Sequence, residues 1–100
     1  MRRVVRFRAD AEQDLRDAIS WYDREREGLG DELLAEVDAA LTRAAERPAV
    51  FPVVLAPFRR ALCERFPYAI YFRETDDLVQ VFAVFHARRD PRELRKALAR

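Results

Sequence analysis

The sequence predicts an α+β fold with elements in the order β-α-α-β-β-β-α, in which a helical hairpin packs on one face of a mostly antiparallel four-stranded sheet. Three observations support this prediction. Residues 10–47 carry apolar side chains at helical spacing and are divided by two glycines. Residues 58–86 hold runs rich in aromatic and β-branched side chains, which favour strands. The length of 100 residues is that of one domain, spanning 1–100.

The first strand and the first helix have separate signals. Arg3–Arg8 alternates apolar and basic residues, which predicts a strand with Val5 and Phe7 directed inward. Asp10 and Gln13 form a D-x-x-Q pattern, which predicts a capping box at the start of a helix. The apolar stripe of this helix consists of Ala11, Leu15, Ala18, Ile19 and Tyr22, with Trp21 at its margin.

A second helix is predicted from Asp31 to Arg47. Gly28-Leu29-Gly30 should end the first helix, because glycine readily takes the left-handed conformation beyond a helix C-terminus. Pro48 should end the second helix. The link is short, so the two helices should form an antiparallel hairpin. The second stripe consists of Leu33, Leu34, Val37, Ala40, Leu41, Ala44 and Ala45.

The remaining residues should form the sheet and a last helix. The connector Pro48–Pro57 contains three prolines and has no sustained period. Strands are predicted at Phe58–Glu64, Arg65–Glu74 and Leu78–His86, and Asp90-Pro91 should open a short C-terminal helix. The pattern does not fix whether the first strand joins this meander at an edge or beside a non-adjacent strand.

The strand Leu78–His86 is apolar on both of its faces. Strict alternation places Val79, Val81, Ala83 and Phe85 on one face, and Leu78, Gln80, Phe82, Val84 and His86 on the other. An antiparallel sheet with one solvated face alternates more cleanly than this. We therefore expect something to cover the face that carries Leu78, Phe82 and Val84: the C-terminal helix, the connector or another chain. Of these, we favour the connector together with a partner chain.

Composition and charge limit the kinds of function. No apolar stretch is long enough to span a membrane and no signal peptide is evident, so we expect a cytoplasmic protein. Ala9–Arg47 holds 12 acidic and 5 basic side chains, a net charge of −7, against +8 outside it. Either the two regions neutralise each other, or each faces a partner of opposite charge. The single cysteine, Cys63, excludes an intrachain disulfide and is expected to be a small strand residue.

Motifs for nucleotide, metal and serine chemistry are missing from the sequence. We expect no cofactor and no metal. The remaining candidate is a cationic set that we expect to bind partners, namely Arg59, Arg60, Arg73, His86, Arg88 and Arg89. The strand directions place His86 and Arg60 apart, and Asp90 is a local counter-ion for Arg88 and Arg89. His86 is accordingly expected to be a packed strand-end residue, with acid–base cleavage of RNA as the alternative.

Five fragments carry a family resemblance in this order: DLRDAISWYDRE, GLGDELLAEVD, RPAVFP, RRALCERFPYAIYFRE and VFAVFHARRDP. Together they resemble the ParE branch of the RelE/ParE family of bacterial type II toxin–antitoxin toxins. The resemblance implies a cognate, ParD-like antitoxin that wraps a C-terminal segment around the toxin. It also implies non-enzymatic poisoning of DNA gyrase. The residues that we assign to the structural family motif are Trp21, Tyr22, Gly28, Gly30, Phe66, Pro67 and Tyr68.

The other branch of the family provides the runner-up function. RelE-type toxins are ribosome-dependent mRNA endonucleases, and they usually carry a tyrosine just after the fourth strand or near the C-terminus. Here Ala87 follows His86, and no tyrosine occurs after Tyr71. His86 and Arg60 do fall where some of these ribonucleases have functional residues, so both are the runner-up catalytic residues. A non-toxic module that only binds its antitoxin is a third possibility.

Overall fold

The computed structural model describes residues 2–100 and contains one mixed sheet with three α-helices. The sheet order is β1-β5-β4-β3-β2, and every neighbouring pair is antiparallel except β1 and β5, which are parallel. The first strand therefore joins at an edge. The elements are β1 (Val4–Phe7), α1 (Ala9–Glu25), α2 (Leu29–Glu46), a 3-10 turn (Pro48–Val50), β2 (Val53–Leu55), β3 (Phe58–Leu62), β4 (Tyr68–Glu74), β5 (Leu78–His86) and α3 (Pro91–Ala99).

The predicted α+β fold is confirmed, but the sheet has five strands instead of four. The additional strand, β2, lies in the connector and pairs with β3 through Val53↔Arg59 and Leu55↔Phe58. The three residues of β2 are too few for a recognisable period. Only the pairing partner makes this segment a strand.

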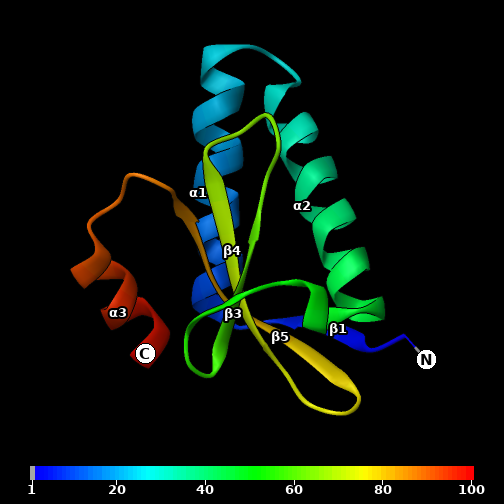
Figure 1. The fold of residues 1–100 in the computed structure, drawn as a ribbon. Helices are drawn as coiled ribbons and strands as arrows, with labels where there is room; N and C mark the ends of the chain where they lie inside the picture. The colour runs from blue at the N-terminus through cyan, green and yellow to red at the C-terminus, as the bar shows by residue number, and fades with distance from the viewer. Residues whose placement is uncertain (1) are drawn as a thin grey trace.

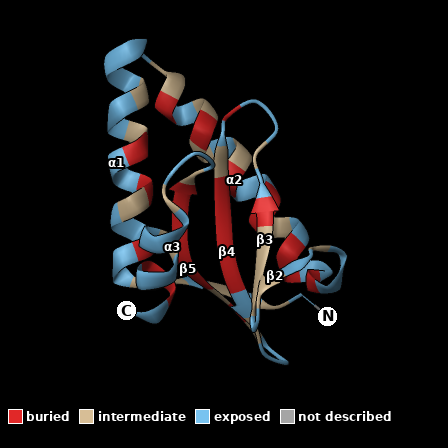
Figure 2. Cartoon of the chain, turned by 60° about the vertical axis from the view of Figure 1, so that its left-hand side comes forward, coloured by how far each residue is buried: buried red, intermediate tan, exposed pale blue. Residues whose placement is uncertain are grey.

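The helical hairpin covers one face of the sheet, which we call the helix face (Figure 1). The apolar stripes of both helices bury against it, and Leu33 and Val37 of α2 are fully inaccessible to solvent. From the sheet, Ile70, Phe72 and Val79 complete this core. In Figure 2 the buried residues run along β4 and β5, while the outer sides of α1 and α2 are exposed.

The ends of the helices differ from the sequence prediction in two ways. The capping box is wrong, because α1 begins at Ala9 and its N-cap residue, Arg8, makes no side-chain hydrogen bond. Gln13 instead donates to the Asp17 carboxylate at 2.8 Å. Gly28 has the predicted left-handed conformation, with φ of 86°, but it stands at the N-cap of α2. Gly30 lies inside α2 and is buried.

The opposite side of the sheet, which we call the second face, is covered in part from within the chain, and Leu62 at its β3 side stays 53% exposed. A β-bulge in β5 breaks the strict alternation, since Tyr71 pairs with Ala83 and Phe72 with Val81. Phe82 and Ala83 consequently both belong to the second face, whereas Val84 returns to the helix face. The residues that cover the second face are Leu94, Ala97 and Leu98 of α3, and Val54 and Leu55 of the connector.

Candidate functional site

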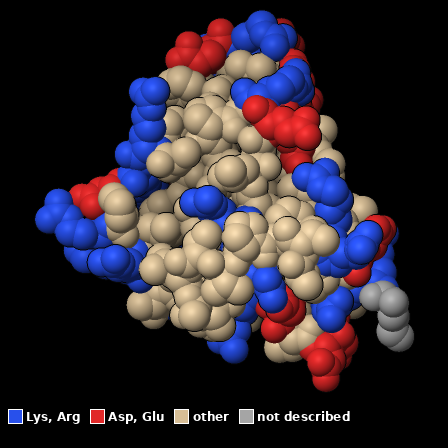
Figure 3. All heavy atoms as spheres, in the orientation of Figure 1, with Lys and Arg blue, Asp and Glu red and all other residues tan. Residues whose placement is uncertain are grey.

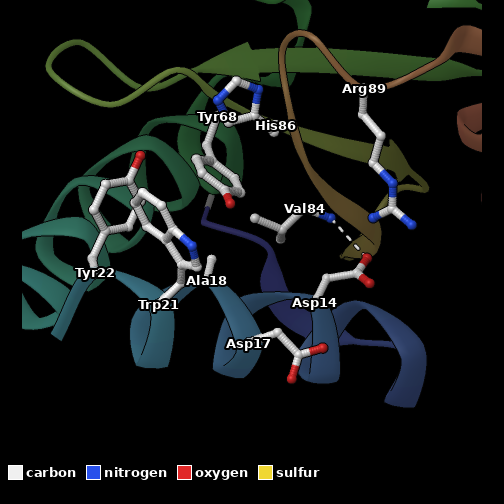
Figure 4. A pocket seen from close by; sticks show the side chains of 9 residues that line it. All are labelled: Asp14, Asp17, Ala18, Trp21, Tyr22, Tyr68, Val84, His86 and Arg89. Carbon is white, nitrogen blue, oxygen red and sulfur yellow. Dashed lines mark hydrogen bonds between the residues drawn. The ribbon is translucent and has the colours of Figure 1, made fainter. Parts of the chain in front are cut away.

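A groove with a volume of about 410 Å³ lies between α1 and the end of β5. The rings of Trp21, Tyr22 and Tyr68 lie together on one side of it, and Arg89 extends on the other side towards Asp14 (Figure 4). The other lining residues are Asp17, Ala18, Val84 and His86. The groove therefore combines an aromatic wall with side chains of both charges.

The aromatic wall is a series of edge-to-face contacts. The Tyr68 ring lies 5.3 Å from the His86 ring and 5.9 Å from the Tyr22 ring, measured between centroids. Tyr22 also contacts Trp21 at 5.0 Å and Phe66 at 4.9 Å. Such pairs add to the stability of a core and fix ring positions. Trp21 is still 49% exposed, so the series ends at the surface.

His86 and Tyr68 form a pair that the sequence prediction missed. They are register partners on β4 and β5, eighteen positions apart in the chain. The Nδ1 of His86 accepts a hydrogen bond from the backbone N–H of Arg88 at 3.0 Å, which orients the ring. Burial, followed by the nearby Tyr22, raises the pKa of Tyr68, and Arg89 opposes this shift. The Tyr68 hydroxyl is therefore protonated at neutral pH.

The structure does not bring Arg60 together with His86. Arg60 pairs with Tyr71, which belongs to the second face, whereas His86 pairs with Tyr68, which packs against the helix-face core. Since side chains alternate along a strand, positions three apart lie on opposite faces, roughly 10 Å apart along β4. The two runner-up catalytic residues thus point to opposite sides of the sheet.

The other predicted arginines differ in whether they form an ion pair with a carboxylate of the chain. The Nε of Arg59 donates to both carboxylate oxygens of Glu74, at 2.9 and 3.0 Å. Arg89 lies over the Phe85 ring at 4.0 Å and forms an ion pair with Glu93 at 2.9 Å. The expected counter-ion role of Asp90 is wrong, because Asp90 pairs with Arg92 and caps α3. Arg60, Arg73 and Arg88 form no ion pair within residues 2–100.

Ion pairs between the acidic segment Ala9–Arg47 and the rest of the described residues lie at two places, around Arg65 and around Arg100. Glu36 of α2 accepts hydrogen bonds from the backbone N–H groups of Glu64 and Arg65 and from the Arg65 side chain. Burial alone would raise the pKa of Glu36, but these hydrogen bonds outweigh it and lower the pKa. The arrangement fixes the loop between β3 and β4 to the helical hairpin.

The second place is the exposed edge of β5, which β1 does not reach. The Asp14 carboxylate accepts a hydrogen bond from the Val84 N–H at 3.2 Å and from Arg100 at 2.8 Å. Arg100 also donates to the Phe82 carbonyl at 3.2 Å and pairs with Asp10 at 3.2 Å. Side chains thus satisfy backbone groups that an edge strand otherwise leaves open to another strand.

Cys63 and the acidic residues do not form a reactive or metal-binding site. Burial, together with the Glu36 carboxylate, raises the pKa of the Cys63 thiol to about 11. A thiol with such a pKa is a weak nucleophile at neutral pH. Within residues 2–100, no group of three or more His, Cys, Asp or Glu side chains is placed to hold a metal ion. No helix of this part of the chain is long and apolar enough to cross a bilayer.

The family model for the ParE toxin of the type II toxin-antitoxin system parDE matches residues 5–91. The chain belongs to the ParE toxin family. Toxin ParE2 of Mycobacterium tuberculosis, recorded for strains CDC 1551 / Oshkosh and H37Rv, is 29% identical over 92 residues. The match covers 91% of this chain and 88% of that protein.

The fold agrees with that of a solved relative. A chain of the chromosomal ParDE TA system from P. aeruginosa superposes with a TM-score of 0.73 at 14% sequence identity. The superposition covers 84% of this chain and 95% of that chain. The chain is therefore a ParE-type toxin of a type II toxin–antitoxin system. The resemblance to the ParE branch that the sequence predicted is confirmed.

Proposed function

We propose that this ParE-type toxin stops bacterial growth by inhibiting DNA gyrase without enzymatic turnover, and that a cognate ParD-like antitoxin neutralises it. The family match over residues 5–91 carries the proposal. The placement of Arg60 and His86 on opposite faces supports a binding mode of action. A general base and a phosphate-stabilising cation must both reach one reacting centre, and these two residues do not.

The groove and the second face are the surfaces that we assign to partners. The groove offers an exposed aromatic side chain, Trp21, beside the charged groups Asp17 and Arg89. Exposed aromatic residues next to charges are typical of binding hot spots and their rims. Apolar contacts would supply most of the affinity, and charge complementarity would set the register and the association rate.

A supercoiling assay tests the proposed target. Purified gyrase should lose its ability to supercoil relaxed plasmid as the chain is added, and premixing the chain with its antitoxin should restore the activity. Trp21→Ala removes the exposed aromatic group at the groove margin and should weaken the inhibition. Arg24→Gln removes a charge from another exposed position on α1, so it is the control and should inhibit like wild type. Full supercoiling with the chain in molar excess would exclude gyrase as the target.

The close contact of Tyr68 and His86 favours one second candidate, a ribosome-dependent mRNA endonuclease. Two ionisable rings with Arg89 on the same groove could act on an RNA backbone from the helix face. Primer extension on mRNA from cells that express the chain distinguishes the two functions. In-frame cuts that are lost in both His86→Ala and Tyr68→Phe, and kept in Arg24→Gln, would establish the endonuclease and replace the gyrase proposal.

A further inference from the structure

Positive charge is concentrated in residues 88–100, which form α3 and the loop before it. This segment holds six basic and two acidic side chains, a net charge of +4, whereas the other residues together carry −3. We call its cations the basic surface, which consists of Arg88, Arg89, Arg92, Arg95, Lys96 and Arg100. In Figure 3 basic side chains gather at the left margin, where Figure 1 places α3, with few acidic atoms among them.

The helix α3 has one apolar face and one basic face. Ala97 and Leu98 are buried against the second face of the sheet. Arg92, Arg95 and Lys96 stand three and four positions apart, so they share the other face of the helix, and all three are exposed. The helix therefore presents these three cations to solvent as one row.

The two acidic side chains of this segment do not neutralise the row. Asp90 caps α3 and pairs with Arg92 at the surface, and Glu93 pairs with Arg89. Three of the cations form no ion pair within residues 2–100, namely Arg88, Arg95 and Lys96. Like charges three and four positions apart destabilise a helix. The fold thus keeps a repulsive row that an external polyanion would stabilise.

A hollow of about 370 Å³ continues the basic surface from α3 towards β5. Three cations line it, Arg89, Lys96 and Arg100, against one carboxylate, that of Glu93. Lys96 belongs both to this hollow and to the exposed row on α3. The basic surface is therefore continuous around this side of the helix.

We propose that the basic surface binds the sugar–phosphate backbone of double-stranded DNA, with Arg92, Arg95 and Lys96 along one strand. The nine residues of α3 are about 13.5 Å long, and a DNA strand has one phosphate per about 3.4 Å of duplex axis, so α3 spans about four phosphates. The planar fork of arginine suits two hydrogen bonds to one phosphate. The inference goes beyond the proposed inhibition of gyrase, because it gives the toxin its own contact with DNA, the substrate of that enzyme.

The composition of this surface favours duplex DNA over three other anionic partners. Charge pairs give a protein partner its specificity and association rate more than its affinity, and the row on α3 offers no exposed apolar side chain beside its cations. A helix that lies on a membrane inserts its apolar face, but here that face is packed on the sheet. Single strands stack their bases on aromatic rings, and residues 88–100 contain no aromatic residue. Phosphate contacts alone supply essentially all of the affinity of non-specific duplex binding.

Fluorescence anisotropy with a labelled duplex of about 20 base pairs and the purified chain tests the proposal. The wild type should bind the duplex at about 50 mM salt, and the logarithm of its affinity should fall against the logarithm of the salt concentration with a slope of about −3 to −4. In the double variant Arg92→Gln/Lys96→Gln, the slope should become shallower by about 2 and the dissociation constant should rise roughly 10- to 100-fold. The melting temperature of this variant should stay level, because Ala97 and Leu98 still hold α3 on the sheet.

The double variant Arg16→Gln/Arg24→Gln is the matched control, because it changes the net charge equally at two exposed positions of α1. It should bind the duplex within about threefold of wild type, since charges distant from the contact are screened. No binding by the wild type, or the same affinity in wild type and Arg92→Gln/Lys96→Gln, would overturn the inference. An equal loss in both double variants would also overturn it, because net charge instead of the row on α3 would then govern binding.

Two further measurements separate the inference from its neighbours. If Arg92→Gln/Lys96→Gln binds the duplex like wild type but loses binding to a polyglutamate peptide, the row belongs to an acidic protein partner and the inference fails. If gyrase keeps full activity with the chain in molar excess, the proposed target fails, while duplex binding that depends on Arg92 and Lys96 leaves the contact with DNA standing.

Discussion

Gly30 lies in the first turn of α2, where α2 packs tightly against Ile19 and Asp23 of α1. A Cβ atom at this position would lie 2.7 Å from the Ile19 backbone oxygen, 2.7 Å from the Ile19 Cγ2 and 2.7 Å from the Asp23 Oδ1. The Gly30 N–H also donates to the same Asp23 oxygen at 2.7 Å. A side chain can turn aside, but the Ile19 oxygen is part of α1, so Gly30→Ala must move the helices apart.

The size of this effect follows from three contributions. Overpacking of a tight contact costs about 1–3 kcal/mol. Weakening of the hydrogen bond to Asp23 costs about 1 kcal/mol more. The better helix propensity of alanine returns about 1 kcal/mol. We therefore expect Gly30→Ala to lower the free energy of unfolding by about 1–3 kcal/mol, which corresponds to a melting temperature roughly 5–20 °C lower.

Thermal unfolding followed by circular dichroism measures this change, and Gly28 provides a matched control. A Cβ at Gly28 would meet nothing within 4 Å, but the φ of 86° is unfavourable for alanine. Gly28→Ala should cost about 1 kcal/mol, and Gly28→Asn should cost less, because asparagine tolerates this conformation better. If Gly30→Ala melts at or above the wild-type temperature, the close contact of the helices at Gly30 is wrong.

Three more predictions concern stability and reactivity. Glu36→Gln should cost about 1 kcal/mol at pH 7 in urea unfolding. The pKa of Glu36 is lowered by folding, so its stabilisation is complete above the ordinary glutamate pKa and is lost as the pH falls through the lower folded value. The variant should consequently lose less stability than wild type below about pH 4.3. Cys63, with a pKa of about 11, should react with a disulfide reagent at pH 8 roughly 100-fold more slowly than an ordinary thiol until urea unfolds the chain. Arg100→Gln should cost about 1–2 kcal/mol, with faster amide exchange in α3, because Asp14 and the Phe82 carbonyl lose their common donor.

The helices and the order of the elements were predictable because their patterns are local and long. Two stripes at helical spacing specify the hairpin, and the predicted inward side chains of both helices do face the core. Asp90 and Pro91 mark the start of α3, where the Asp90 carboxylate accepts the Arg92 N–H at 2.8 Å. The exact helix starts were less predictable. Arg8 instead of Asp10 occupies the first N-cap position, so a capping pattern alone did not locate it.

Features that depend on pairing between distant segments were not predictable from the pattern. The bulge at Phe82 changes which side chains of β5 share a face, and alternation cannot reveal it. β2 is too short to recognise without its partner β3. The contact of Tyr68 with His86 comes from the register of β4 and β5. A search for a tyrosine that follows the last strand in the sequence therefore missed the one that lies beside it in space.

The most direct test of the account is the growth of bacteria that express this chain with and without the antitoxin encoded beside it. A ParE-type toxin should arrest growth and cause filamentation when it is expressed alone, and growth should recover when the antitoxin is co-expressed. Normal growth with the folded chain present at high level would contradict the assignment as a toxin and favour a module that only binds its antitoxin.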